Sequence, residues 1–350
     1  MRRNVPTPPN KSSAMSDLDL LQKKIKELGI GRVLVLVDEQ VDKLYPHHLY
    51  TLETNIPCEK IIIPAGEGSK SIAQASRIWQ QMLQWQMDKD CAVLNFGGGM
   101  VCDLGGFVAA TYKRGIACIN YPTTLLAMID AAHGGKTAID LDGVKNCVGV
   151  VRQPAFVMPA NTQFLRTLPE RELRSGFGEL IKYALISSKP LFEELYTMDT
   201  LTAEAIQPEW IQHCIDFKNR IVEIDPDDRR ERRVLNFGHT VGHALESLFA
   251  QKGQPLAHGE AVAIGILYES RMANQAGMLP KEDLSRIESL VSKHFPLPVL
   301  SAEDKARING FMKQDKKNNQ GKINIVMLKR IGEACGPSED DGFGKSPISF

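Results

Sequence analysis

The chain has 350 residues, of which 43% are hydrophobic and 24% charged, and its 42 basic and 42 acidic side chains give a formal net charge of zero. These values are typical of an ordinary soluble globular protein with one large or two medium domains. They exclude a general basic field that would hold nucleic acid or a membrane surface, and no apolar run approaches the roughly 18 residues of a spanning helix.

The first half of the chain alternates short β-branched runs with helical patterns. The strand candidates are residues 32–37, 60–63, 92–96 and 117–121, and residues 71–87 carry helix-length periodicity. This alternation predicts parallel strands joined by crossover helices. From about residue 163 onward amphipathic helical patterns dominate, which predicts a second, mainly helical part.

We therefore expect an α/β domain over residues 16–160 and a helical domain over residues 161–335. Residues 1–15 and 336–350 are rich in Pro, Ser, Gly and Asp, which predicts flexible tails. The basic amino-terminal segment has no apolar core behind it, so it does not read as a signal peptide. The 7 cysteines are widely spread without a CxxC pair, which favours reduced thiols in a cytoplasmic enzyme.

A glycine triplet at residues 97–99 directly follows the strand candidate at 92–96 and precedes a helix-compatible stretch. Glycines at such a turn let backbone N–H groups approach a phosphate, and the helix N-terminus favours negative charge. The pattern predicts a dinucleotide-type phosphate site; a tight turn packed for steric reasons is the alternative. Asp38, at the end of the first strand, could accept ribose hydroxyls or cap a helix, and Glu67 and Lys70 add polar groups at strand ends.

The segment from Thr123 to Asn146 is dense in polar groups, among them Asp130, Lys136 and Lys145. Lysine provides a point charge for phosphate or carboxylate, and an asparagine can both donate to and accept from a sugar hydroxyl. These residues predict an anionic, polyhydroxylated substrate. Solvated surface lysines are the alternative.

Four side chains suggest a metal site. His239 and His243 lie four residues apart and would share one helix face, His258 could close around the same point, and Glu179 lies three residues before Lys182 in an apolar helical segment. Two histidines and one carboxylate with an open position make a common catalytic zinc set. Three of the four groups could bind a divalent ion, which leaves one histidine for substrate or proton transfer; the alternative is a set of solvated or hydrogen-bonded imidazoles.

Together these segments resemble the 3-dehydroquinate synthase family of sugar phosphate cyclases. The blocks that carry the resemblance are residues 97–115, 122–137, 144–150, 167–186, 232–246 and 258–265, in the family's order. The resemblance implies a phosphorus–oxygen lyase of the shikimate pathway of aromatic amino acid biosynthesis. It would convert 3-deoxy-D-arabino-heptulosonate 7-phosphate into 3-dehydroquinate and phosphate by transient oxidation, phosphate elimination, re-reduction and aldol closure.

The resemblance also implies roles for individual residues. It makes Glu179, His239 and His258 the ligands of one zinc or cobalt ion and leaves His243 free. The substrate-facing set would be Asp130, Lys136, Lys145, Asn146, Lys182, Arg232, Asn236 and His243, joined by Arg114, Lys218 and the pair Lys316 and Lys317. NAD would be bound by Asp38, Glu67, Lys70, Gly98, Gly99, Asp103, Thr123, Thr124, Leu126, Lys136, Lys145, Phe164 and Thr167. Members of the family are commonly homodimers, and Arg114 could reach the phosphate across the dimer interface.

Other functions stay open at this stage. Another cyclase acting on a seven-carbon sugar phosphate is one alternative, although Arg232 and Asn236 favour a substrate with a carboxylate. A metal-dependent alcohol or glycerol dehydrogenase would share the two-domain plan without needing this density of lysine and arginine. A binding or scaffold protein that kept only the fold is the third alternative.

Overall fold

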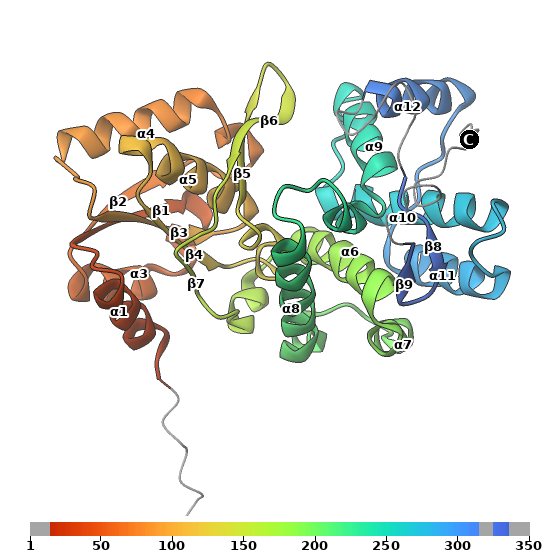
Figure 1. The fold of residues 1–350 in the computed structure, drawn as a ribbon, viewed down its shortest axis with the longest axis horizontal. Helices are drawn as coiled ribbons and strands as arrows, with labels where there is room; N and C mark the ends of the chain where they lie inside the picture. Colours follow the sequence, from red (N-terminus) through yellow and green to blue (C-terminus); the bar gives the residue numbers. More distant parts are fainter. Residues whose placement is uncertain (1–14, 315–324, 336–350) are drawn as a thin grey trace, which may run out of the picture.

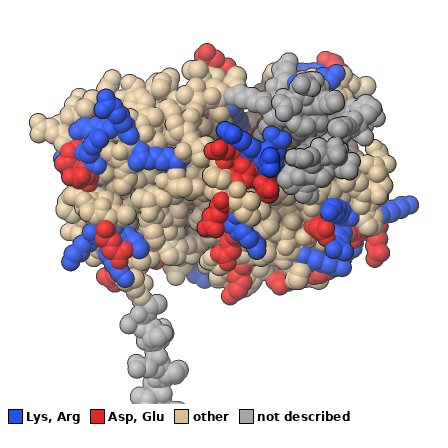
Figure 2. Space-filling model, in the orientation of Figure 1, with Lys and Arg blue, Asp and Glu red and all other residues tan. Residues whose placement is uncertain are grey.

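The computed structural model describes residues 15–314 and 325–335. Residues 1–14 and 336–350, which make up nearly all of the two predicted tails, lie outside the described residues. Figure 1 shows a sheet with its helices beside a second, helical part of the chain. Basic and acidic side chains lie next to one another in several places on the face shown in Figure 2, in keeping with the net charge of zero.

A 5-stranded sheet in the order β2-β1-β3-β4-β7 forms the centre of the first half, and all its strand pairs are parallel. The predicted parallel sheet is confirmed. Strands β1 and β3 are buried along nearly their whole length because other elements cover both faces, which is why their sequences are continuously apolar. The strands are β1 (Arg32–Asp38), β2 (Cys58–Ile63), β3 (Cys91–Gly97), β4 (Ala117–Pro122) and β7 (Phe156–Val157).

Helices connect these strands as crossovers. They are α2 (Glu39–Leu44), α3 (Pro46–Asn55), α4 (Ile72–Gln84) and α5 (Gly99–Thr111), and α1 (Asp17–Glu27) precedes the first strand. Helix α4 is the one predicted from periodicity; it starts after Ser71, whose hydroxyl accepts from the N–H of Gln74. Helix α5 starts directly after β3, so the glycine triplet is the strand-to-helix turn that the sequence predicts.

A β-hairpin that the sequence analysis did not anticipate carries several of the candidate substrate residues. Strand β5 (Lys136–Leu141) pairs antiparallel with β6 (Val144–Val151). Between them Asp142 and Gly143 have φ angles of +50° and +78°, as the two central residues of a type I′ turn require. An Asp-Gly pair between β-branched runs is a strong hairpin signal, so the sequence did contain the information.

The second half is mainly helical, as predicted. Its helices are α6 (Glu170–Ser187), α7 (Lys189–Thr197), α8 (Pro208–Ile224), α9 (His239–Gln251), α10 (His258–Gln275), α11 (Lys281–His294) and α12 (Ala302–Gln314). A short antiparallel pair, β8 (Leu328–Arg330) and β9 (Glu333–Ala334), was not predicted. Within the described part of the chain, no helix combines the length and apolar character needed to cross a membrane.

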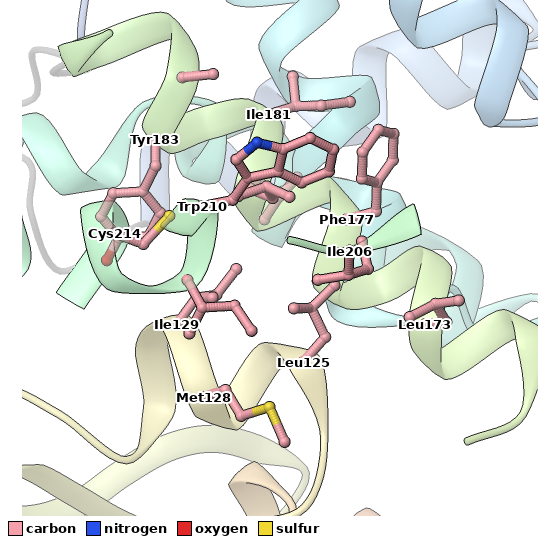
Figure 3. Close-up of a cluster of buried hydrophobic side chains, with 14 of the residues drawn as sticks. Leu125, Met128, Ile129, Leu173, Phe177, Ile181, Tyr183, Ile206, Trp210 and Cys214 are labelled. Carbon is pink, nitrogen blue, oxygen red and sulfur yellow. The ribbon is translucent and has the colours of Figure 1, made fainter. Parts of the chain in front are cut away.

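One apolar cluster joins the two halves of the molecule (Figure 3). Leu125, Met128 and Ile129, which follow β4, pack in the same buried cluster as Phe177 of α6 and Trp210 of α8. Burial of such side chains contributes about 1.5–3 kcal/mol each, so this contact holds the sheet edge against the helices. The expected division into two domains near residue 160 stays a prediction.

Glycines set the close approach of helices α6, α9 and α10. A Cβ at Gly178 would overlap the carbonyl oxygen of Gly259, and a Cβ at Gly265 would overlap that of Gly238. These contacts place the backbones of neighbouring helices against one another, which fixes the residues beside them. Glu179 follows Gly178, and His239 and His258 flank the partner glycines.

Helix α9 receives its N-terminal cap from another helix. Gly238, its cap residue, has no side chain to accept a hydrogen bond, and the buried carboxylate of Glu269 on α10 accepts instead from the N–H groups of Gly238 at 2.7 Å and Val241 at 3.2 Å. A carboxylate at a helix N-terminus satisfies the free N–H groups and complements the helix dipole. Glu269 therefore fixes the end of α9 at which His239 lies.

Replacement of Gly178 by Ala tests this arrangement. The added methyl group forces α6 and α10 apart, so we expect a loss of about 1–3 kcal/mol in unfolding free energy and weaker metal binding. Thermal unfolding and metal content after gel filtration measure both effects. Gly310→Ala is the matched control, because nothing lies within 4 Å of its Cβ position in α12 and the change should stabilise slightly. A Gly178→Ala protein as stable as the control would contradict the account.

Candidate active site

Three helices bring the candidate metal ligands together. Glu179 lies in the middle of α6, and His239 and His258 are the first residues of α9 and α10. The Nε2 atoms of His239 and His258 lie 3.3 Å and 3.1 Å from Oε1 of Glu179. One donor atom of each residue lies within 4.8 Å of the other two, so a single ion could contact all three.

The donor set fits a divalent transition metal. The side chain of Glu179 is 0% exposed, and neither of its oxygens has a hydrogen-bond partner of good geometry, although Lys182 and both histidines lie within ion-pair distance. A buried carboxylate needs a cation or hydrogen bonds to offset the cost of its burial. Two imidazoles with one carboxylate are ligands suited to zinc or cobalt.

The charges around Glu179 change the protonation of its neighbours. Burial alone would raise the pKa of Glu179, but the Lys182 ammonium at 2.5 Å and the His239 imidazole hold that pKa well below its usual range. Burial lowers the pKa of His239, which favours the neutral ring that a metal needs. Burial opposes protonation of His258 too, yet its contacts with Glu179 and Glu246 raise its pKa to about 10.

His243 lies beside the other two histidines. Its ring centroid is 5.5 Å from that of His239 and 6.1 Å from that of His258. His243, Glu246 and His258 make up a second group whose donor atoms lie within 4.8 Å of one another. The structure thus brings together all four residues that the sequence nominated for the metal. The assignment of His243 as the histidine that does not bind the ion stays a prediction.

A second charged cluster adjoins the first. Asp130 lies in a π-helical turn, Ala127–Ala131, a distortion frequent at functional sites. Its Oδ1 accepts from Lys218 Nζ at 2.8 Å and from Tyr183 Oη at 2.6 Å, and its carbonyl accepts from Lys218 at 2.6 Å. Burial would raise the pKa of Asp130, but Lys218 and Lys182 lower it, so the carboxylate stays ionised.

The hairpin carries three candidate substrate residues, and its two lysines pair with acidic side chains of the helical half. Lys136 Nζ pairs with Asp228 at 2.5 Å, and Lys145 Nζ pairs with Glu246 of α9 at 3.0 Å. Asn146 has a φ of +51°, and its N–H donates to Asp140 at 2.8 Å. Each lysine side chain is about half exposed, at 50% and 49%, yet each is fixed by an acidic partner.

The segment before α9 contributes Arg232 and Asn236. Arg232 is 2% exposed, and its guanidinium donates to the carbonyls of Gly134 at 2.8 Å and Pro226 at 3.0 Å. Asn236 ends the 3₁₀ turn Glu231–Asn236, immediately ahead of the ligand segment. Arg232 thereby links this segment to the Gly134 turn before the hairpin.

The predicted nucleotide residues lie mostly at the carboxyl ends of β1, β3 and β4. Asp38 caps α2, with Oδ1 accepting from the N–H groups of Gln40 and Val41, and ribose binding by Asp38 stays a prediction. A Cβ at Gly98 would lie 2.9 Å from Cγ2 of Thr124, so the chain passes closely there. This edge also holds Gly99, Thr123 and Leu126.

Lys70 organises the polar groups beside this edge. The side chain is 4% exposed and pairs with Asp103 at 2.7 Å and Glu67 at 3.4 Å. Burial raises the pKa of Asp103 to about 6, against the lowering effect of Lys70. Phe164 and Thr167 follow the sheet and are held by Tyr45, whose hydroxyl bonds the carbonyl of Phe164 and the hydroxyl of Thr167.

Of the predicted residues that the structure describes, Arg114 is not brought to this site. Arg114 lies in the turn Tyr112–Arg114 before β4, at the sheet edge opposite Thr123, and forms no ion pair or hydrogen bond with the other candidates that the structure describes. Lys316 and Lys317 lie outside the described residues.

Two residues of the site were missed by the sequence analysis. Tyr183 contacts Asp130, and Glu246 contacts both Lys145 and His258. Helical spacing could have identified Glu246, because it lies two turns beyond His239 on the same face of α9.

Comparison with known proteins gives a consistent result over most of the chain. Residues 60–175 match the family model described as 3-dehydroquinate synthase N-terminal, and residues 176–318 match that described as 3-dehydroquinate synthase C-terminal. The 3-dehydroquinate synthase of Parabacteroides distasonis is 36% identical over 320 residues, 89% of each chain. That of Clostridium perfringens is 41% identical over 278 residues, 79% of this chain and 78% of the relative.

Solved structures share the fold. A 2-deoxy-scyllo-inosose synthase complexed with carbaglucose-6-phosphate, NAD⁺ and Co²⁺ is similar with a TM-score of 0.77 and 26% identity, over 91% of this chain and 88% of that one. The 2-epi-5-epi-valiolone synthase of Streptomyces hygroscopicus, with NAD⁺ and Zn²⁺ bound, has a TM-score of 0.81 at 24% identity, over 96% and 94% of the two chains. At that identity the likeness shows the fold alone.

The two histidines of α9 should respond differently to replacement. His239→Ala removes a nitrogen next to Glu179 and should abolish metal retention, whereas His243→Ala should keep the ion and lose activity. Elemental analysis after gel filtration, with turnover assayed on the same samples, separates the two effects. Equal metal loss in both variants would show that the two imidazoles are assigned wrongly.

Proposed function

The chain belongs to the 3-dehydroquinate synthase family, and we propose that it converts 3-deoxy-D-arabino-heptulosonate 7-phosphate into 3-dehydroquinate and phosphate. The observation that carries the proposal is the convergence of Glu179, His239 and His258 beside a cluster of lysines and arginine. A metal-dependent alcohol dehydrogenase would need the metal ligands but not the cluster of lysines and arginine. The substrate is a small sugar phosphate, and the reaction is that of a lyase in the shikimate pathway.

NAD and one divalent ion, zinc or cobalt, are the cofactors of this enzyme. Glu179, His239 and His258 would hold the ion, and the edge formed by the ends of β1, β3 and β4 would hold NAD. When bound, NAD would supply a hydride acceptor and donor, and the ion would supply a Lewis acid that lowers the pKa of the hydroxyl being oxidised. The metal ligands and the nucleotide residues are far apart in the sequence, and the contact between the sheet edge and α6 brings them together.

The chain's own charged groups bind and orient the substrate. Lys218 is buried and tied to Asp130 through two contacts, so it presents a fixed positive charge to a carboxylate or phosphate. Arg232 is held by Gly134 and Pro226, which orients its planar guanidinium for an anion. His243, beside the ligand histidines, moves a proton at a ring nitrogen.

The hairpin supplies the remaining polar contacts. Lys136 on β5 and Lys145 on β6 pair with acidic side chains of the helical half, and Asn146 follows Lys145 on β6. The substrate's anionic groups would bind beside these ion pairs, which hold the two ammonium groups in place. Closing the hairpin over the substrate would exclude water during elimination of phosphate.

The active enzyme is a cytoplasmic homodimer that binds no nucleic acid. Arg114 supports the dimer, because it lies at the sheet edge opposite the nucleotide residues and would contact the substrate phosphate of another copy of the chain. Its φ of +66°, next to Lys113 at +47°, is a strained conformation of the kind found at functional turns.

Release of inorganic phosphate tests the function. The purified protein with NAD and zinc or cobalt should release phosphate from 3-deoxy-D-arabino-heptulosonate 7-phosphate without accumulating NADH. A chelator should abolish the reaction, and either metal should restore it. A seven-carbon sugar phosphate that lacks the carboxylate, and glycerol, are the matched substrates. Phosphate release only from the sugar phosphate that lacks the carboxylate, or net NADH formation with glycerol, would overturn the proposal.

A further inference from the structure

We propose that Glu246 is a positioning residue that orients the metal-ligand ring of His258 and anchors Lys145 of the hairpin with the same carboxylate. The inference rests on the proposed function, since it takes His258 as a ligand and Lys145 as a substrate contact. It adds a residue that the sequence analysis did not nominate.

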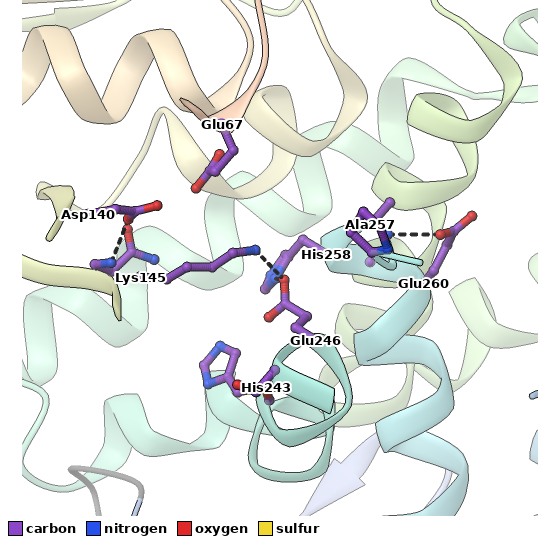
Figure 4. Close-up of polar contacts among 12 residues, drawn as sticks. Glu67, Asp140, Lys145, His243, Glu246, Ala257, His258 and Glu260 are labelled. Atoms are coloured by element: carbon purple, nitrogen blue, oxygen red, sulfur yellow. Dashed lines mark hydrogen bonds and ion pairs between the residues drawn. The ribbon is translucent and has the colours of Figure 1, made fainter. Parts of the chain in front are cut away.

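The geometry places Glu246 between two functional groups from different parts of the chain (Figure 4). Its side chain is 8% exposed, and Oε1 lies 3.7 Å from Nδ1 of His258 and 3.0 Å from Nζ of Lys145. On the other side of the same ring, Nε2 of His258 lies 3.1 Å from Glu179. Each ring nitrogen of His258 therefore faces a carboxylate.

This arrangement sets the orientation of the imidazole. A histidine that binds a metal through one nitrogen carries its proton on the other, and a carboxylate or carbonyl beside that N–H fixes the tautomer and the ring plane. His239 has such a partner, because its Nδ1 lies 3.1 Å from the carbonyl of Phe237. Glu246 is the corresponding partner of His258, and it brings a full negative charge.

The contact with Lys145 gives Glu246 its second role. Lys145 is on β6, in the half of the molecule that holds the sheet, whereas Glu246 is on α9. Their ion pair holds the hairpin against the helix that carries His239 and His243. The carboxylate is nearly inaccessible to solvent, so it needs both cations to offset its burial.

A different role for Glu246 is that of a ligand. His243, Glu246 and His258 have donor atoms close enough to hold an ion of their own. The Lys145 ammonium argues against this, because it contacts the same oxygen, Oε1, that faces His258, and its charge would repel a cation there. In Glu179, by contrast, Lys182 contacts Oε2 and the two histidines face Oε1. The number of ions bound per chain separates the two roles.

The test compares Glu246→Gln, which keeps the shape of the side chain and removes its charge, with Lys145→Met and with Asp304→Asn. Asp304 is a matched control, because it is a carboxylate of 8% exposure paired with Lys252 at 2.6 Å, away from the metal ligands. Titration of the metal-free proteins with Co²⁺, followed by visible absorption, gives affinity and stoichiometry without any turnover. NAD affinity and the KM of the heptulosonate phosphate are measured in parallel.

We expect Glu246→Gln to weaken Co²⁺ binding about 10-fold to 100-fold and to change the Co²⁺ spectrum, with NAD affinity kept. Lys145→Met should leave Co²⁺ binding unchanged and raise the KM. Glu246→Gln alone should also raise the KM, because Lys145 loses its anchor. Adding Lys145→Met to Glu246→Gln should therefore raise the KM little further. Asp304→Asn should reduce thermal stability alone.

Wild-type Co²⁺ affinity and spectrum in Glu246→Gln would overturn the proposal, even with reduced stability. Two ions per chain, the second lost in this variant, would make Glu246 a ligand and also overturn it. If Glu246→Gln does not fold, Glu246→Asp takes its place. This variant keeps the charge but moves the carboxylate back by one methylene group, and it must weaken Co²⁺ binding relative to Asp304→Asn. A wild-type protein that binds one Co²⁺ but releases no phosphate would refute the proposed function, while the Co²⁺ comparison still decides the role of Glu246.

Discussion

The buried carboxylate of Glu179 is the constraint around which the active site is built. A charge removed from water costs several kcal/mol unless other charges compensate it, and here Lys182 and two imidazoles surround it. Lys182 lies three residues after Glu179 on α6, but the two imidazoles reach Glu179 only through the close packing of α6, α9 and α10. The glycine contacts between these helices are therefore as important to the site as the ligands themselves.

A consistent pairing of charges extends from this centre. Four lysines nominated for substrate binding lie among the described residues, and each is held by a carboxylate: Lys182 by Glu179, Lys218 by Asp130, Lys145 by Glu246 and Lys136 by Asp228. Pairing fixes long side chains in place before the substrate arrives, which reduces the entropy lost on binding. It also balances the charge of a site that must accept an anionic substrate.

Much of the fold could be predicted from the sequence. Strands β1 to β4 were identified because buried parallel strands are continuously apolar, and the helical half because its periodicity is strong. The hairpin was missed although Asp142 and Gly143 signal its turn, and β8 and β9 are too short to leave a pattern. The four metal-site candidates were nominated from local spacing, since His239 and His243 share one helix face.

The remaining features depend on contacts between distant segments. Which residues surround Glu179 is decided by how closely three helices approach, and that depends on single glycines rather than on any periodic pattern. Glu246 has ordinary helical neighbours in sequence, and only the folded chain places Lys145 and His258 against it. A contact with a second copy of the chain, such as that expected of Arg114, is not predicted by local sequence patterns either.

The most direct test is a crystal structure of the zinc-loaded protein with the ion located by its anomalous scattering. We expect one peak, about 2.0–2.2 Å from a carboxylate oxygen of Glu179 and from Nε2 of His239 and of His258. A peak coordinated instead by His243 and Glu246, or one that leaves Glu179 without contact to the ion, would contradict it.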